Sequence, residues 1–136
     1  MESDVLVDSN VYIDLLKARK DVTWVLPAWA GDRNLVICGM VRLEVLRGLT
    51  SLKLMTRLSA FMDVLCNVPG DDLFWNEATD LAWKLDRKGI VIPAADAVIA
   101  ASALRLGASV LTSDAHFQRI DGLRTITPPP DWFVRE

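Results

Sequence analysis

The residues of this sequence best suited to do chemistry are acids at the ends of apolar segments. Asp8 directly follows the apolar run 5–7, and Asp114 follows the apolar run 110–111 after two polar residues. Ligands of open parallel sheets bind outside the carboxyl ends of the strands. If both runs are strands of such a sheet, the two carboxylates lie at the same edge.

Two further acids border apolar helical segments. Asp96 opens the alanine-rich stretch 95–106, so a helix there carries it in its first turn. Glu44 shares one helical face with Val41 and Val45, which places it beside a buried stripe. We therefore expect four carboxylates from distant parts of the chain to converge.

Converging carboxylates need a counter-charge. Two like charges 4 Å apart repel by about 4 kcal/mol at an effective dielectric constant near 20, which is a large share of the stability of an ordinary domain. Such a cluster must bind protons or a cation. Oxygen ligands without paired cysteines favour Mg²⁺ or Mn²⁺, and a chain with one histidine is a poor candidate for zinc.

Each acid taken singly also has a purely structural interpretation. Asp8 and Asp114 are plausible helix caps, and Asp96 complements a helix dipole. Glu44 is spaced to pair with Arg47 on the surface of a helix. The joint placement of the four acids, rather than any one of them, carries the metal-site hypothesis.

Other catalytic arrangements fit the sequence less well. The chain has no GK pair for a phosphate-binding loop, no GxGxxG and no GxSxG. Ser113, Asp114 and His116 are too close along one loop to form an ordinary catalytic triad. We interpret His116 as a local hydrogen-bonding or substrate-contact residue.

Composition indicates a globular protein of one domain. The chain has 136 residues, of which 51% are hydrophobic and 24% charged, and its net charge of −3 argues against binding nucleic acid through bulk positive charge. Cys38 and Cys66 are interpreted as buried, reduced thiols of a cytoplasmic protein. The acidic start lacks the basic region of a signal peptide, and no apolar run is long enough for a membrane span.

The hydrophobic pattern alternates between strands and helices. Unbroken apolar runs separated by helical periodicity predict a parallel sheet covered on both faces, in one α/β domain. The tail PPPDWF is not expected to continue a helix or a central strand. The expected strands are 5–7, 35–38, 65–68, 110–111 and an edge strand 124–126. The expected helices are 11–17, 22–30, 40–48, 51–64, 72–89 (capped by Asp72) and 95–106.

Three segments together resemble a known family. They are VDSN at 7–10, GMVRLEVLRG at 39–48 and PAADAVIAASALRLGASVLTSDAHF at 93–117. The chain resembles the PIN-domain family over nearly its whole length, and in particular the VapC-type toxin ribonucleases of bacterial type II toxin–antitoxin pairs. The last segment is the most specific, whereas the PPPDWF tail has no counterpart that we can match.

The resemblance implies a three-layer α/β/α sandwich with a mostly parallel central sheet, formed by residues 1–136 as a single PIN domain. It implies cleavage of single-stranded RNA with Mg²⁺ or Mn²⁺, formation of a homodimer, and silencing by an antitoxin protein. The family's four acids correspond to Asp8, Glu44, Asp96 and Asp114. Its supporting polar residues correspond to Asn10 and Thr112, with Ser113 beside them.

The mechanism expected on this basis is hydrolysis of a phosphodiester bond. Asp8, Asp96 and Asp114 would bind the ion directly, and Glu44 would bind it or hold a water. A divalent ion lowers the pKa of water and offsets charge on phosphate, so no separate general base is required. Basic side chains would line the rim of the site or simply face solvent as parts of helices; the candidates are Arg42, Arg47, Lys53 and Arg57.

Three alternatives remain open at this point. The chain could be a PIN-fold interaction module without catalysis, although all four acids are present. It could be a PIN nuclease that acts on another nucleic acid. A phosphatase of the haloacid dehalogenase type requires DxD after the first strand, and here Asn10 stands two residues after Asp8.

Overall fold

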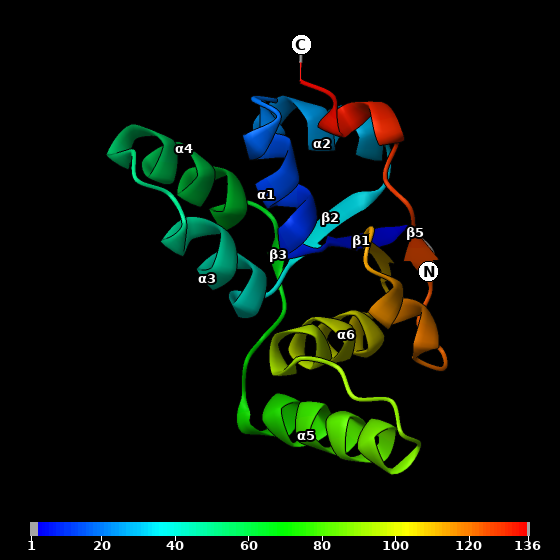
Figure 1. Ribbon diagram of the computed structural model, residues 1–136. Coiled ribbons are helices and arrows are strands. Elements are labelled where there is room, and N and C mark those ends of the chain that lie inside the picture. The colour runs from blue at the N-terminus through cyan, green and yellow to red at the C-terminus, as the bar shows by residue number, and fades with distance from the viewer. Residues whose placement is uncertain (1–2, 136) are drawn as a thin grey trace.

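The computed structural model describes residues 3–135, which form a central sheet flanked by helices (Figure 1). The strands are β1 (Asp4–Val7), β2 (Asn34–Ile37), β3 (Cys66–Asn67), β4 (Ser109–Leu111) and β5 (Thr125–Ile126). The helices are α1 (Ser9–Lys17), α2 (Val22–Ala30), α3 (Gly39–Arg47), α4 (Leu52–Asp63), α5 (Asp72–Arg87) and α6 (Ala94–Leu106). Two short 3₁₀ helices follow, η1 (Ala115–Arg119) and η2 (Pro130–Phe133).

The sheet has five strands in the order β3-β2-β1-β4-β5, and every neighbouring pair is parallel. Strand β1 lies at the centre, where Leu6 pairs with Val36 of β2 and Val110 of β4. These three side chains are at most 1% exposed. Strands buried on both faces need continuous apolar runs, which explains why the sequence does not alternate there.

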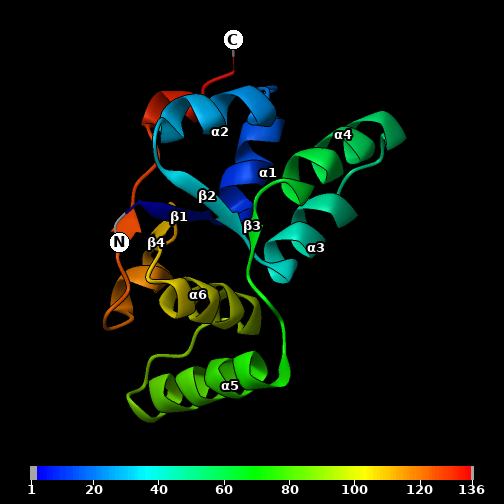
Figure 2. The same cartoon turned by 180° about the vertical axis from the view of Figure 1, so that it is seen from behind.

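Helices cover both faces of the sheet, as the prediction of a three-layer α/β/α sandwich required. Figures 1 and 2 show α1 and α2 on one side of the strands, and α6 with α5 on the other. Helix α6 lies against β1 and β4, and α5 packs on its outer side. Helix α3 contacts both α1 and α6, so it stands beside the carboxyl ends of the strands.

Helix α6 lies close to the sheet because its buried positions carry small side chains. Residues 97–103 are all buried, and four of these seven are alanines. Small side chains allow the helix axis to approach the strands, and Gly107 ends the helix in the left-handed conformation with a φ of 67°. The short strand β4 follows directly, so the helix that carries Asp96 is joined by a short turn to the strand that precedes Asp114.

Several predicted boundaries are shifted. The first helix begins at Ser9 rather than at residue 11, because Asp8 takes the N-cap position. The predicted cap Asp72 is wrong by one residue: the side chain of Asp71 accepts a hydrogen bond from the backbone N–H of Phe74. Both differences arise where two neighbouring polar residues were equally suitable as caps.

The interpretation of Cys66 as a buried thiol is also wrong. Cys38 is buried, but Cys66 is exposed, because it lies on β3, a strand of two residues at the edge of the sheet. In the tail, four residues of PPPDWF form η2, where the ring of Trp132 meets Trp29 of α2 edge to face at 5.9 Å. Within residues 3–135, no helix is both long and apolar enough to cross a membrane.

Candidate metal centre

Asp8 lies at the carboxyl end of the central strand and is almost completely buried. Only 2% of the residue is exposed. Its backbone N–H donates to the carbonyl of Leu111 at 3.0 Å, which ties the end of β1 to β4. The hydroxyl of Thr112 donates to its carboxylate Oδ2 at 2.9 Å. The parallel pairing of β1 and β4 therefore sets the position of this carboxylate.

Asp114 is oriented by the turn that follows β4. Its backbone N–H donates to Thr112 Oγ1 at 2.9 Å, and its own Oδ1 accepts from the backbone N–H of His116 at 2.9 Å. The second contact caps η1. Thr112 thus contacts both acids, which explains why a threonine suits this position better than an apolar β-branched residue.

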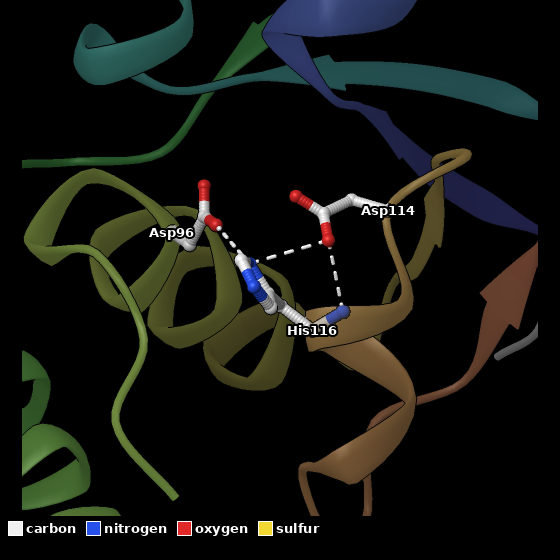
Figure 3. A group of neighbouring side chains, drawn as sticks. All are labelled: Asp96, Asp114 and His116. Atoms are coloured by element: carbon white, nitrogen blue, oxygen red, sulfur yellow. Dashed lines mark hydrogen bonds and ion pairs between the residues drawn. The ribbon is translucent and has the colours of Figure 1, made fainter.

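Asp96 faces this turn from the first turn of α6. Figure 3 shows the ring of His116 between the carboxylates of Asp96 and Asp114. The ring nitrogen Nδ1 is 3.1 Å from Asp96 Oδ2 and 3.2 Å from Asp114 Oδ1. One ligand atom from each of these three residues lies within 4.8 Å of the other two.

Glu44 is held by the neighbouring helix rather than by Arg47. The hydroxyl of Ser9, in the first turn of α1, donates to Glu44 Oε1 at 2.7 Å. Helices α1 and α3 follow the adjacent strands β1 and β2 and pack against each other, which brings the first turn of α1 beside the second turn of α3. Ser9 is buried and Glu44 is half-buried, which makes this contact part of the junction between the two helices.

Burial and repulsion between the acids raise the pKa of two of them. Burial, together with repulsion from Asp96 and Asp114, raises the pKa of Asp8 from 3.8 to about 6, against the lowering effect of the Thr112 hydrogen bond. Burial also raises the pKa of Asp96, with repulsion from Asp114 and Glu44 adding to it and the hydrogen bond from His116 opposing it. Uncompensated negative charge therefore accumulates at this edge of the sheet.

The predicted site residues divide into two groups. Asp8, Glu44, Asp96 and Asp114 gather at the carboxyl edge, and Thr112 contacts two of them. The other two predicted supporting residues have exposed side chains at the rim. They are Asn10, in the first turn of α1, and Ser113, in the loop after β4.

Two of the predicted rim cations have partners elsewhere. Arg42 pairs with Asp63 at 2.7 Å and donates to Ser59, which joins α3 to α4. Arg57 pairs with Asp21 at 2.7 Å, which joins α4 to the start of α2. Both arginines therefore connect helices, which neither the rim interpretation nor the interpretation as solvent-facing side chains had predicted.

The donor set suits a hard divalent ion. Four carboxylates supply anionic oxygens, which Mg²⁺ and Mn²⁺ prefer, and repulsion among these groups adds to the effect of burial in raising the pKa values of Asp8 and Asp96. Among residues 3–135, the mutually close ligand atoms belong to Asp96, Asp114 and His116. Asp8 lies close enough to this group for its carboxylate to repel those of Asp96 and Asp114, and the carboxylate of Glu44 repels that of Asp96.

Comparison with known families identifies the chain. The family model described as "PIN domain" matches residues 5–123, which include all four acids. This chain belongs to the PIN-domain family. The predicted resemblance is thereby confirmed for the family, and the α/β architecture of this PIN domain agrees with it. A comparison with curated protein sequences found no significant match.

Solved structures share the fold of this PIN domain at low sequence identity. VapBC2 from Rickettsia felis, bound to a DNA fragment from its promoter, has a TM-score of 0.75 at 19% identity, over 91% of this chain and 98% of that chain. DNA-bound VapBC from Salmonella typhimurium has a TM-score of 0.75 at 23% identity, over 93% and 98%. VapBC-1 from nontypeable Haemophilus influenzae has a TM-score of 0.72 at 22% identity, over 91% and 97%.

Two residues of the centre were not predicted as part of it. Ser9 was not singled out from the sequence, because its partner Glu44 lies 35 positions away along the chain. His116 was interpreted as a local hydrogen-bonding or substrate-contact residue, whereas its ring also contacts Asp96, 20 positions away along the chain. The signal that could have suggested this contact is that the only histidine of the chain lies two residues after Asp114.

Proposed function

We propose that this PIN domain is a Mg²⁺- or Mn²⁺-dependent endoribonuclease that acts as the toxin of a toxin–antitoxin pair and hydrolyses single-stranded RNA. The observation that carries the proposal is the gathering of Asp8, Glu44, Asp96 and Asp114 at one edge of the sheet, with repulsion that a divalent ion relieves. The shared fold of VapBC structures supports the toxin class. We take residues 1–136 as one domain that acts in the cytoplasm.

The side chains take distinct roles in this proposal. Asp8, Asp96 and Asp114 hold the ion, and Glu44 holds it or orients a water. When bound, the ion would lower the pKa of a water and place positive charge opposite the phosphate. Thr112 holds Asp8 and Asp114 in place, because its hydroxyl donates to the Asp8 carboxylate and accepts from the backbone N–H of Asp114.

The remaining polar residues act around these acids. Ser9 fixes the carboxylate of Glu44 through its 2.7 Å hydrogen bond. Asn10 and Ser113 are exposed at the rim, where they are placed to contact the sugar–phosphate backbone of a substrate.

RNA cleavage by purified variants tests the proposal. We expect Asp96→Asn and Asp114→Asn each to lower the rate at least about 100-fold, because each substitution removes charge that holds the transition-state-stabilising ion. The exposed Asp32→Asn serves as a control for the loss of one acid. Cleavage by Asp96→Asn at the parent rate would refute the assignment, and cleavage of DNA in preference to RNA would favour a different nuclease of this family.

A groove beside Glu44 supports the antitoxin part of the proposal. It lies between α1 and α3, has a volume of about 400 Å³ and is largely apolar. An amphipathic segment of a partner would bury apolar side chains there while covering Glu44. Its lining residues are Ile13, Leu16, Lys17, Glu44, Val45, Gly48 and Leu49.

Co-expression with the product of the adjacent reading frame tests this partner site. We expect Leu49→Glu to reduce co-purification strongly, because a charge in the groove opposes burial of an apolar segment. Leu52→Glu on α4, where the native side chain is 79% exposed, is the matched control. Equal co-purification of both variants would place the partner elsewhere.

Exposed apolar side chains support the homodimer. Leu43 of α3 and Trp75 of α5 are 57% and 49% exposed, and both line a cavity of about 310 Å³. A second copy would cover this face. We expect Trp75→Glu to shift the molecular mass measured by light scattering from dimer to monomer, whereas Leu52→Glu leaves it unchanged. A monomeric parent protein would contradict the dimer.

A further inference from the structure

His116 contributes a nitrogen atom to a centre that otherwise consists of carboxylates. Its Nδ1 lies 3.1 Å from Asp96 Oδ2 and 3.2 Å from Asp114 Oδ1, so one atom reaches two acids on different elements (Figure 3). The four acids were expected from the sequence as oxygen ligands. The imidazole changes the chemical character of the centre, because it is a softer donor than a carboxylate.

The fold fixes the backbone that carries this ring. The backbone N–H of His116 donates to Asp114 Oδ1 at 2.9 Å at the start of η1. The next residue, Phe117, is fully buried and anchors the same short helix in the core. The His116 side chain itself is 42% exposed, so its place between the acids is not imposed by crowding of the ring.

The spacing suits ligands of one ion. Ligand atoms of Asp96, Asp114 and His116 all lie within 4.8 Å of one another. Two ligands at adjacent positions of an octahedral ion stand about 3 Å apart, and His116 Nδ1 lies at nearly that distance from both Asp96 Oδ2 and Asp114 Oδ1. The neutral ring carries one hydrogen on either nitrogen, so Nδ1 can present a lone pair when Nε2 holds the hydrogen.

We propose that His116 Nδ1 is a ligand of the divalent ion and biases the centre toward Mn²⁺ over Mg²⁺. This inference rests on the proposed function, because it concerns the ion of that same site. Imidazole suits first-row transition ions, whereas Mg²⁺ prefers oxygen ligands and retains waters. Three carboxylates and one imidazole hold Mn²⁺ better than an all-oxygen set does.

The single histidine of the chain makes a spectroscopic test unambiguous. Pulsed electron paramagnetic resonance of the Mn²⁺-loaded protein detects nitrogen bound directly to the ion. We expect an imidazole ¹⁴N coupling in the parent protein and in Gln118→Ala, an exposed control in the same 3₁₀ helix. We expect no such coupling in His116→Gln, which retains a hydrogen-bond donor without the imidazole.

Labelling provides the same test without a substitution. In parent protein expressed in cells supplied with ¹⁵N-histidine, the ¹⁴N coupling should be replaced by a ¹⁵N coupling. Because it uses the parent protein, this measurement tests the proposal even if a His116 variant fails to fold. A coupling that is insensitive to histidine labelling would overturn the assignment.

Ion affinity gives a second readout that is independent of cleavage. We expect His116→Gln to lower the Mn²⁺ affinity about tenfold or more and the Mg²⁺ affinity by a smaller factor. Equal losses for both ions would show that His116 only orients Asp96 and Asp114. Bound Mn²⁺ without imidazole coupling overturns this inference alone, whereas failure of the parent protein to bind Mn²⁺ overturns the proposed function as well.

Discussion

At the scale of single residues, Asp8 shows most clearly that this site opposes folding. Only 2% of this residue is exposed, and its carboxyl lies near two other acids. Because its pKa is about 6 in the folded protein and 3.8 when unperturbed, the folded state binds a proton more tightly than the unfolded state does. In the absence of an ion, the free energy of unfolding therefore decreases as the pH rises from about 4 to about 6.

The first prediction at this scale is that Asp8→Asn stabilises the ion-free protein at pH 7. The substitution removes the buried charge and leaves an oxygen that accepts the hydrogen bond from Thr112. We expect the free energy of unfolding to rise by about 1–3 kcal/mol and its dependence on pH between about 4 and 6 to weaken. Urea denaturation at pH 4 and pH 7 measures both, with Asp32→Asn as the exposed control.

The second prediction concerns the residue that joins two of the acids. Thr112→Val removes the hydroxyl that donates to Asp8 and accepts from the backbone N–H of Asp114. We expect a loss of about 1–3 kcal/mol in the free energy of unfolding and a further rise in the pKa of Asp8, since Thr112 lowers it. Thr112→Ser should recover most of both effects, and unchanged values in the valine variant would contradict the contact.

At the scale of elements, the site depends on how close α6 lies to the sheet. Ala100 and Ala103 are fully buried, so the helix has no room for larger side chains on that face. The distance between this helix and β4 determines how Asp96 faces Asp114. Packing of the helix and geometry of the centre are therefore coupled.

This coupling gives the third prediction. Ala103→Leu should lower the free energy of unfolding by about 1–3 kcal/mol, because the added methylene groups must displace the helix or its neighbours. Ala94→Leu, at the exposed start of the same helix, should have little effect. Chemical denaturation measures both variants, and equal stability of the two would show that α6 has more space than its burial indicates.

Most elements were predictable because their sequence signals are local. The runs 5–7 and 110–111 have no polar alternation, and the acids follow them directly, so their meeting at the carboxyl edge followed from parallel pairing alone. The strand order was not predictable, because it depends on which helices cross over which face. Cys66 was assigned wrongly because its apolar neighbours do not reveal that the strand lies at the edge.

The contacts that complete the site could not be predicted for a related reason. The hydrogen bond from Ser9 to Glu44 and the contact between His116 and Asp96 join residues on different elements. Which side chains meet there depends on the distances between α1 and α3 and between η1 and α6. Local sequence patterns contain no measure of these distances.

At the scale of the whole molecule, the centre exists only when the entire domain is folded. Its acids follow β1, lie in the second turn of α3 and the first turn of α6, and follow β4, so their positions along the chain span more than a hundred residues. The unfolded chain cannot bring them together. An ion that binds this centre therefore stabilises the folded state by mass action.

Thermal unfolding of ion-free protein, measured with and without Mn²⁺, tests the central claim most directly. We predict a stabilisation of about 2.7 kcal/mol at 100 times the dissociation constant, which should be abolished in a variant carrying both Asp96→Asn and Asp114→Asn. The exposed Asp32→Asn variant should respond as the parent does. An unfolding temperature of the parent protein that does not change at millimolar Mn²⁺ would contradict the existence of a metal centre at this edge of the sheet.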